Sequence, residues 1–223
     1  MHWRREVAWH PGDLAWRVAM LFIVGSSLFA LGSFPPYAQL MDPRAVGITF
    51  VIGSLFFTSA AFSQLVQVSE GIRVWSPPSH GKLWWACVVQ LVGTLLFNAN
   101  TIDATITTFD VQQENRLVWA PDFFGSIAFL VASHLAWLAT CGRLWAVDRD
   151  DPDWWSAFVN YLGSILFMAS ALAAFTLHTT GEVVNLTIVN AGTFLGAVGF
   201  WIGAWVLLPE ARSPAAAPDH SPT

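Results

Sequence analysis

The stretch Trp16–Phe29 reads WRVAMLFIVGSSLF, and its pattern decides the fold because the chain carries that pattern three times. In each copy a Trp stands nine residues before a Gly, and Leu-Phe follows three and four residues after that Gly. The other copies are Trp84–Phe97 and Trp154–Phe167. A second phrase follows each copy, with Gly and Phe four residues apart: Gly53 and Phe57, Gly125 and Phe129, and Gly196 and Phe200. Every phrase lies in a long apolar stretch, so the repeat predicts three tandem helical hairpins.

The composition indicates that these hairpins lie in a membrane. The chain is 55% hydrophobic and 11% charged, whereas about a quarter of the residues of a soluble domain are charged. It also carries 13 Trp and 17 Phe in 223 residues, more apolar surface than a water-soluble fold of this size can bury. The net charge of -5 and the lack of a basic cluster argue against a nucleic-acid partner. The two cysteines, Cys87 and Cys141, form neither a metal-ligand spacing nor a disulfide framework.

Six windows reach the roughly 20 apolar residues that cross about 30 Å of hydrocarbon as a helix. They predict an all-α integral membrane protein with spans at Leu14–Ser33, Val46–Val66, Leu83–Asn100, Phe123–Cys141, Trp155–Leu177 and Leu186–Leu208. Prolines separate the spans, and the first span is too long for the apolar region of a cleaved signal peptide, so we expect it to remain as an anchor. The chain then divides into a cytoplasmic N-terminus (1–13), hairpin repeats at 14–73, 74–145 and 146–208, and a disordered cytoplasmic tail (209–223).

The distribution of Lys and Arg predicts the orientation. Eight of the ten lie in the termini and in the second and fourth connections, which places both termini in the cytoplasm by the positive-inside rule. Nine tryptophans fall near the same predicted boundary, where indole rings are typical of a headgroup belt: Trp3, Trp9, Trp16, Trp75, Trp84, Trp85, Trp145, Trp154 and Trp155. Because each unit holds two spans, all three units enter the membrane in the same direction. We therefore expect parallel repeats around a pseudo-threefold axis along the membrane normal.

The hairpin pattern resembles a known family. An apolar helix with Gly-Ser/Thr-x-Leu-Phe, a short turn and a second apolar helix with Gly-Ser-x-x-Phe is similar to the YrhK-like family of small bacterial membrane domains. The match is clearest from Trp16 to Gln67, and the third unit departs from it because Ala197 follows Gly196. The resemblance implies a helical hairpin architecture and a location in the bacterial inner membrane. It implies no biochemical activity and no catalytic residues.

Polar residues inside the spans are the candidate functional residues, because polar and ionisable groups are costly in lipid. His134 lies in the fourth span, where it is either an axial ligand to haem or a proton-relay group, or a neutral histidine bonded to Ser or a backbone carbonyl. Gln90 and Asn160 stand at matching positions, three residues before the central Gly of their units, and Asn98 and Asn100 lie near the end of the third span. These four amides either line a polar path on a shared axis or form hydrogen bonds between helices.

The connections carry no recognisable catalytic or metal site. The longest, Thr101 to Asp122, is acidic but lacks the spacing of a calcium loop, and we expect a solvated cap over the bundle. The chain contains no nucleophile elbow, P-loop or dinucleotide fingerprint. We therefore predict no enzymatic activity, cofactor or metal.

Three hypotheses about function follow. The first is a scaffold, accessory subunit or modulator whose partners are the lipid bilayer and other membrane proteins. The second is a small transporter or channel whose path is lined by Gln90, Asn98, Asn100 and Asn160. The third is a haem- or quinone-associated redox protein that uses His134. The sequence names no small-molecule ligand.

Overall fold

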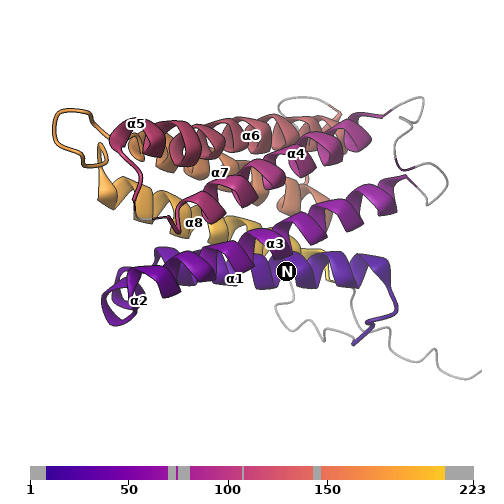
Figure 1. Ribbon diagram of the computed structural model, residues 1–223. Helices are drawn as coiled ribbons and strands as arrows, with labels where there is room; N and C mark the ends of the chain where they lie inside the picture. Colours follow the sequence, from indigo (N-terminus) through magenta and orange to yellow (C-terminus); the bar gives the residue numbers. More distant parts are fainter. Residues whose placement is uncertain (1–8, 70–73, 75–80, 107, 143–146, 209–223) are drawn as a thin grey trace, which may run out of the picture.

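A computed structural model describes residues 9–69, 74, 81–106, 108–142 and 147–208, which form a bundle of long helices (Figure 1). Six helices in this part of the chain are long and apolar enough to cross a membrane. They are α1 (Leu14–Ser33), α3 (Pro43–Val68), α4 (Lys82–Asp103), α6 (Ala120–Cys141), α7 (Pro152–Ala173) and α8 (Leu186–Val206). The described residues form no strand beyond an isolated bridge between Thr176 and Val183. The prediction of an all-helical chain with six membrane-length helices is confirmed.

Local sequence explains where these helices begin. Asp42 and Asp151 precede Pro43 and Pro152, and each aspartate accepts a hydrogen bond from a backbone N–H in the first turn of its helix. Proline is favoured at the first position of a helix, because the backbone N–H that it lacks would have no partner within the helix there. Asn185 caps α8 in the same way, accepting from the N–H of Ile188 at 3.0 Å. The predicted starts of these three spans therefore differ from the observed starts by at most three residues.

The connection between the third and fourth spans differs from our expectation. We predicted a solvated loop from Thr101 to Asp122, but α4 continues through Asp103, and a helical stretch begins at Val111. This stretch comprises α5 (Val111–Gln113) and the π-helix η1 (Glu114–Trp119), and it runs directly into α6. A capping box at Asp110 starts it, because the Asp110 and Gln113 side chains each accept from the other residue's backbone N–H. The prediction of a loop is therefore wrong for residues 101–103 and 111–122, which are helical.

The six long helices pack in a closed ring. The order of contacts around the bundle is α1, α3, α4, α6, α7, α8 and back to α1. The connections that contain α2 (Pro35–Leu40), α5 and residues 174–185 lie at one end of the bundle, at the left in Figure 1, and α1 starts at the other end. We call these the capped end and the terminal end. The capped end is held by hydrogen bonds between Asn115 and the backbone of Thr176, at 2.7 and 2.9 Å.

A layer of phenylalanines fills the middle of the bundle. Each long helix contributes one ring, each at most 6% exposed, and neighbouring ring centroids lie 5.0–6.5 Å apart. The rings belong to Phe29, Phe57, Phe97, Phe129, Phe167 and Phe200. These distances are typical of favourable edge-to-face and offset aromatic pairs. We refer to these six residues as the phenylalanine layer.

The repeated glycines make room for this layer. A Cβ on Gly25 would lie 2.9 Å from a ring carbon of Phe57, and a Cβ on Gly53 would lie 2.8 Å from a ring carbon of Phe29. The same exchange joins α4 to α6 and α7 to α8, with distances of 2.9–3.2 Å. The glycine of one helix therefore accommodates the phenylalanine of its partner, and the reverse. This reciprocal contact explains why Gly and Phe occur together in both phrases.

The repeated tryptophans are packing residues rather than exposed anchors. Trp16, Trp84 and Trp154 are 7%, 4% and 7% exposed, so the expectation that they form a headgroup belt is wrong for these three. Trp9 and Trp85 are 76% and 51% exposed, as a belt requires. Trp155 is half-buried, and the other predicted belt members, Trp3, Trp75 and Trp145, lie outside the described residues. The predicted N-terminus (1–13) is described only from residue 9, and the predicted tail (209–223) lies outside the described residues.

Candidate functional site

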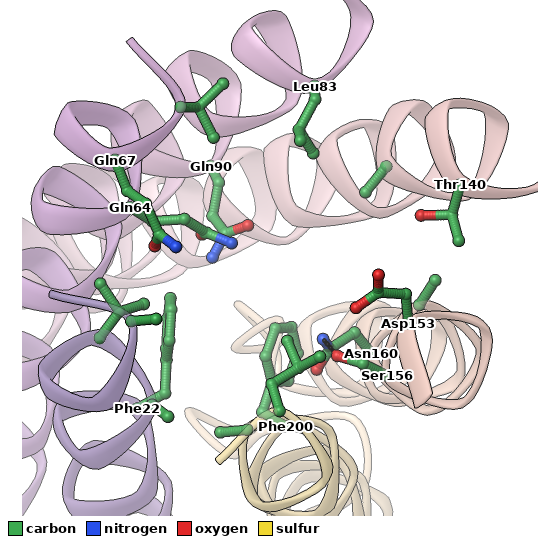
Figure 2. Close-up of a pocket in the computed structure, with 18 of the residues that line it drawn as sticks. Phe22, Gln64, Gln67, Leu83, Gln90, Thr140, Asp153, Ser156, Asn160 and Phe200 are labelled. Carbon is green, nitrogen blue, oxygen red and sulfur yellow. Dashed lines mark hydrogen bonds between the residues drawn. The ribbon is translucent and has the colours of Figure 1, made fainter. Parts of the chain in front are cut away.

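A cavity of about 620 Å³ lies inside the bundle, between the phenylalanine layer and the terminal end (Figure 2). All six long helices line it, and its lining includes Phe22 and one member of the phenylalanine layer, Phe200. Its volume falls in the range of about 300–1,000 Å³ that is typical of small-molecule sites. The phenylalanine layer separates the cavity from the capped end, so the cavity occupies one half of the bundle.

One wall carries amide side chains from α3 and α4. Gln64 and Gln67 come from the last turns of α3, and Gln90 comes from the middle of α4 (Figure 2). The Oε1 of Gln64 is buried and accepts no hydrogen bond from the described residues. An unsatisfied buried acceptor costs about 1–3 kcal/mol. This wall therefore holds an oxygen that a hydrogen-bond donor in the cavity would satisfy.

The opposite wall is one face of α7. Asp153, Ser156 and Asn160 are spaced three and four residues apart, which places them on the same side of a helix. Asn160 Nδ2 donates to Ser156 Oγ at 3.3 Å, while Asn160 Oδ1 is buried without a partner. Gly203 of α8 lies directly against this amide, because a Cβ there would be 2.6 Å from Asn160 Oδ1. Because Gly203 has no side chain, the Asn160 amide has room at the cavity wall.

The cavity lining is mainly apolar, with several polar side chains and one formal charge. Asp153 is the single charged residue among the described residues that line it, and its side chain is exposed. Ser133 and Thr140 of α6 add hydroxyl groups, and the rest of the lining is mainly Ala, Val, Leu and Phe. No described lining residue is Lys, Arg or His. The wall therefore offers hydrogen-bond acceptors and a negative charge without a compensating cation.

The structure divides the four predicted amides into two pairs. Gln90 and Asn160 line the cavity together. Asn98 and Asn100 follow Phe97 in α4, away from the cavity. Asn98 Nδ2 donates to Thr58 Oγ1 at 2.9 Å, and Asn100 Nδ2 donates to the backbone oxygen of Val118 at 2.8 Å. The first pair lines a cavity, and the second pair makes hydrogen bonds between elements.

His134 lies outside the cavity, between α6 and α7. Its Nδ1 is 3.4 Å from the hydroxyl of Tyr161, and the ring is half-buried. His178 is in the connection after α7, where its ring lies 6.5 Å from that of Phe175. Within the described residues, no group of three or more His, Cys, Asp or Glu is placed to hold a metal ion.

Sequence reasoning missed Gln64, Gln67, Asp153 and Ser156. Gln64 carried a usable signal, because it stands eleven residues after the second Gly of its unit, where the other units have Ala136 and Leu207. Gln90 and Asn160 were identified by comparing equivalent positions of the three units, because they are polar where another unit is apolar. The same comparison also identifies Gln64. Asp153 lies in the first turn of α7, on the same helix face as Ser156 and Asn160.

Comparison with known proteins adds no relative: no protein-family model, curated protein or solved structure matches the chain.

Proposed function

We propose that this chain is a non-enzymatic multi-pass membrane protein that binds a small polar molecule in the cavity between the phenylalanine layer and the terminal end. The observation that carries this proposal is the pair of buried, unpartnered oxygens on facing walls, Gln64 Oε1 and Asn160 Oδ1, in a cavity of ligand size. Buried polar atoms in native proteins almost always have a partner, so their exceptions call for an explanation. A bound molecule with N–H or O–H groups would supply the missing partner of each oxygen.

The proposal includes an architecture of three parallel hairpin repeats around a pseudo-threefold axis. Two observations support it: the reciprocal Gly–Phe contacts recur in all three hairpins, and the helices form a closed ring. In addition, the equivalent residues Phe22, Gln90 and Asn160 of the three units all line the same cavity. The axis then passes through the cavity and the phenylalanine layer. The proposed ligand contacts along this axis come from positions such as this one, where the three units carry different residues.

We further propose the bacterial inner membrane as the location, with both termini in the cytoplasm, and membership of the YrhK-like family. The Lys and Arg distribution supports the orientation, and the hairpin pattern supports the family. In this orientation the cavity faces the cytoplasm, because α1 begins and α8 ends at the terminal end. Accessibility of single cysteines placed at Asp13 and at Tyr37 to a membrane-impermeant reagent tests it. Labelling of the cysteine at position 13 in intact cells would contradict this orientation and place the termini outside the cytoplasm.

Transport is a second candidate function, favoured by the position of the cavity. It occupies one half of the bundle and ends at the phenylalanine layer, which is the form expected of a carrier open to one side. A continuous channel on the axis fits less well, because the layer blocks it at mid-depth and Asn98 and Asn100 are bonded elsewhere. The scaffold hypothesis and the haem or quinone hypothesis for His134 stay predictions from the sequence.

The experiment that tests the proposal is gentle purification from the native membrane, followed by mass spectrometry of small molecules that accompany the protein. The comparison variant is Ala136→Phe, which fills the cavity at a position where the other units carry Gln64 and Leu207. Ala139→Leu, on the exposed side of the same helix, is the matched control. We expect a molecule that accompanies the native protein and Ala139→Leu and is lost from Ala136→Phe. Identical small-molecule profiles from all three proteins would refute the proposal.

A further inference from the structure

We infer that the ligand of the cavity is a small organic cation with several N–H donors, such as an amidinium, guanidinium or primary ammonium compound. This inference rests on the proposed function and adds the chemical class of the ligand. It comes from the balance of charges and of hydrogen-bonding groups on the two walls.

The first step is the sign of the charge. Asp153 supplies the formal charge of the described lining, and no Lys, Arg or His of that lining opposes it. A single uncompensated carboxylate attracts a cation and repels an anion, and the attraction is modest here because the Asp153 side chain is exposed to solvent. An anionic ligand would need a cationic partner, as phosphate and carboxylate sites do. The described cavity wall contains none.

The second step is the type of hydrogen bond that the walls lack. Of the buried side-chain atoms without a partner among the described residues, the two that belong to cavity-lining residues are Gln64 Oε1 and Asn160 Oδ1, and both are acceptors. They belong to α3 and α7, on opposite sides of the cavity in Figure 2. Asn160 Oδ1 lies against Gly203, so the proposal requires this amide to rotate until its oxygen faces a molecule in the cavity. A ligand with N–H groups pointing in two or more directions satisfies both, and amidinium and guanidinium groups have this geometry.

The third step concerns the inner end of the cavity. Phe22 and Phe200 line it there, and their rings belong to the apolar core of the bundle. Aromatic faces attract cations because of the ring quadrupole, and they also accept apolar groups. A cation attached to a short apolar body therefore matches both parts of the cavity, with its charged group between the amide walls and its apolar part against the rings.

Three probes of nearly equal shape separate the alternatives: benzamidinium, benzamide and benzoate, which are cationic, neutral and anionic. We would measure their binding to the purified full chain in lipid nanodiscs by calorimetry at constant ionic strength. We expect benzamidinium to bind severalfold more tightly than benzamide, and benzoate to bind more weakly than benzamide, which is the order set by one uncompensated carboxylate.

Two isosteric variants identify the charge. Asp153→Asn should weaken benzamidinium binding severalfold and leave benzamide unchanged, because it removes the charge and keeps the shape. Asp150→Asn, an exposed residue that precedes α7 and does not line the cavity, should have no effect. Gln64→Leu should weaken benzamidinium binding too, and Leu207 at the equivalent position of the third unit indicates that the fold tolerates it. Size-exclusion profiles identical to that of the native chain verify folding.

The probe measurements separate a cation site from a ligand site of another kind. If benzamide or benzoate binds as tightly as benzamidinium, and Ala136→Phe abolishes that binding, the cavity binds ligands but the inference of a cation is wrong. If none of the probes binds, or if Asp153→Asn and Asp150→Asn act alike, the inference is also overturned. The small molecules that accompany the purified protein test the proposed function separately, so the two failures are distinguishable.

Discussion

The glycine at position 192 gives the sharpest test of how the third hairpin is packed. A Cβ placed on Gly192 in α8 would lie 2.8 Å from the backbone oxygen of Leu166 and 2.9 Å from the Cβ of Ser170, both in α7. A backbone oxygen cannot rotate away as a flexible side chain does, so Gly192→Ala must push the two helices apart. The same separation weakens the hydrogen bonds that Ser170 Oγ makes with the Val189 backbone oxygen and with Thr193 Oγ1, both at 2.8 Å.

The magnitude follows from two opposing effects. Overpacking a well-packed site costs about 1–3 kcal/mol, and backbone contacts at this distance place Gly192→Ala toward the upper end of that range. Replacing Gly by Ala in a helix interior gains about 0.8–1.0 kcal/mol from backbone propensity. The expected net loss in the free energy of unfolding is therefore roughly 1–2 kcal/mol. A hydrophobic driving force does not offset it, because lipid tails are as apolar as the helix faces.

The assay is reversible unfolding by SDS in mixed micelles, followed through the intrinsic fluorescence of the tryptophans. Gly47→Ala in α3 is the matched control, since its Cβ would meet a single side-chain methyl, Thr105 Cγ2, at 3.3 Å. We expect that control to be neutral or stabilised by up to about 1 kcal/mol. If Gly192→Ala proves as stable as Gly47→Ala, close backbone contact between α7 and α8 does not hold the third hairpin together.

Three further predictions use the same unfolding assay or the probe measurements above. Phe129→Ala should cost about 3–5 kcal/mol, because this ring is 1% exposed at the centre of the phenylalanine layer. Ala204→Ser should stabilise the protein by about 0.6 kcal/mol, since the repeat places a hydroxyl there against Ser26 Oγ, which is buried without a partner. Gly203→Ala should displace the Asn160 amide, only 2.6 Å from the new Cβ, and weaken benzamidinium binding roughly tenfold, with little change in unfolding free energy.

Each of these has an internal control. Phe124→Ala, in the same helix but 57% exposed, should cost much less than Phe129→Ala, and equal losses would argue against the layer as the core. The gain from Ala204→Ser should disappear when Ser26→Ala is combined with it, as the pair Ser133 and Ser164, 2.7 Å apart at equivalent positions, implies. An unchanged benzamidinium affinity in Gly203→Ala would show that the Asn160 amide does not contact the ligand.

Much of the fold was predictable from the sequence because it depends on local chemistry. Apolar runs of the required length, separated by prolines and preceded by capping residues such as Asp42 and Asn185, locate six helices within a few residues. The stretch from Val111 to Trp119 escaped prediction because its polar composition resembles a loop. Its helix depends on the capping box at Asp110 and on tertiary hydrogen bonds such as that from Trp119 Nε1 to the Ala171 backbone oxygen, at 2.9 Å.

The candidate site was predictable in part. Gln90 and Asn160 were identified because they replace an apolar residue at a repeated position, and they share the cavity. Asn98 and Asn100 belong to the same helix as Gln90, but eight residues of helix move Asn98 about 12 Å along the axis, beyond the phenylalanine layer. Residue type alone identifies all four as polar residues in membrane-length helices. It does not say at which depth in the bundle the helices leave a cavity between them.

The sequence by itself determined that the chain forms membrane-length helical hairpins and that Gly and Phe recur in them. Tertiary structure alone decided which apolar residues face the bundle interior, that Trp16, Trp84 and Trp154 are buried, and where a cavity remains. The physical reason is that lipid and protein interior are equally apolar, so hydropathy does not distinguish the exposed Phe124 from the buried Phe129. That distinction arises only when the helices pack against one another, and the cavity forms at the same stage.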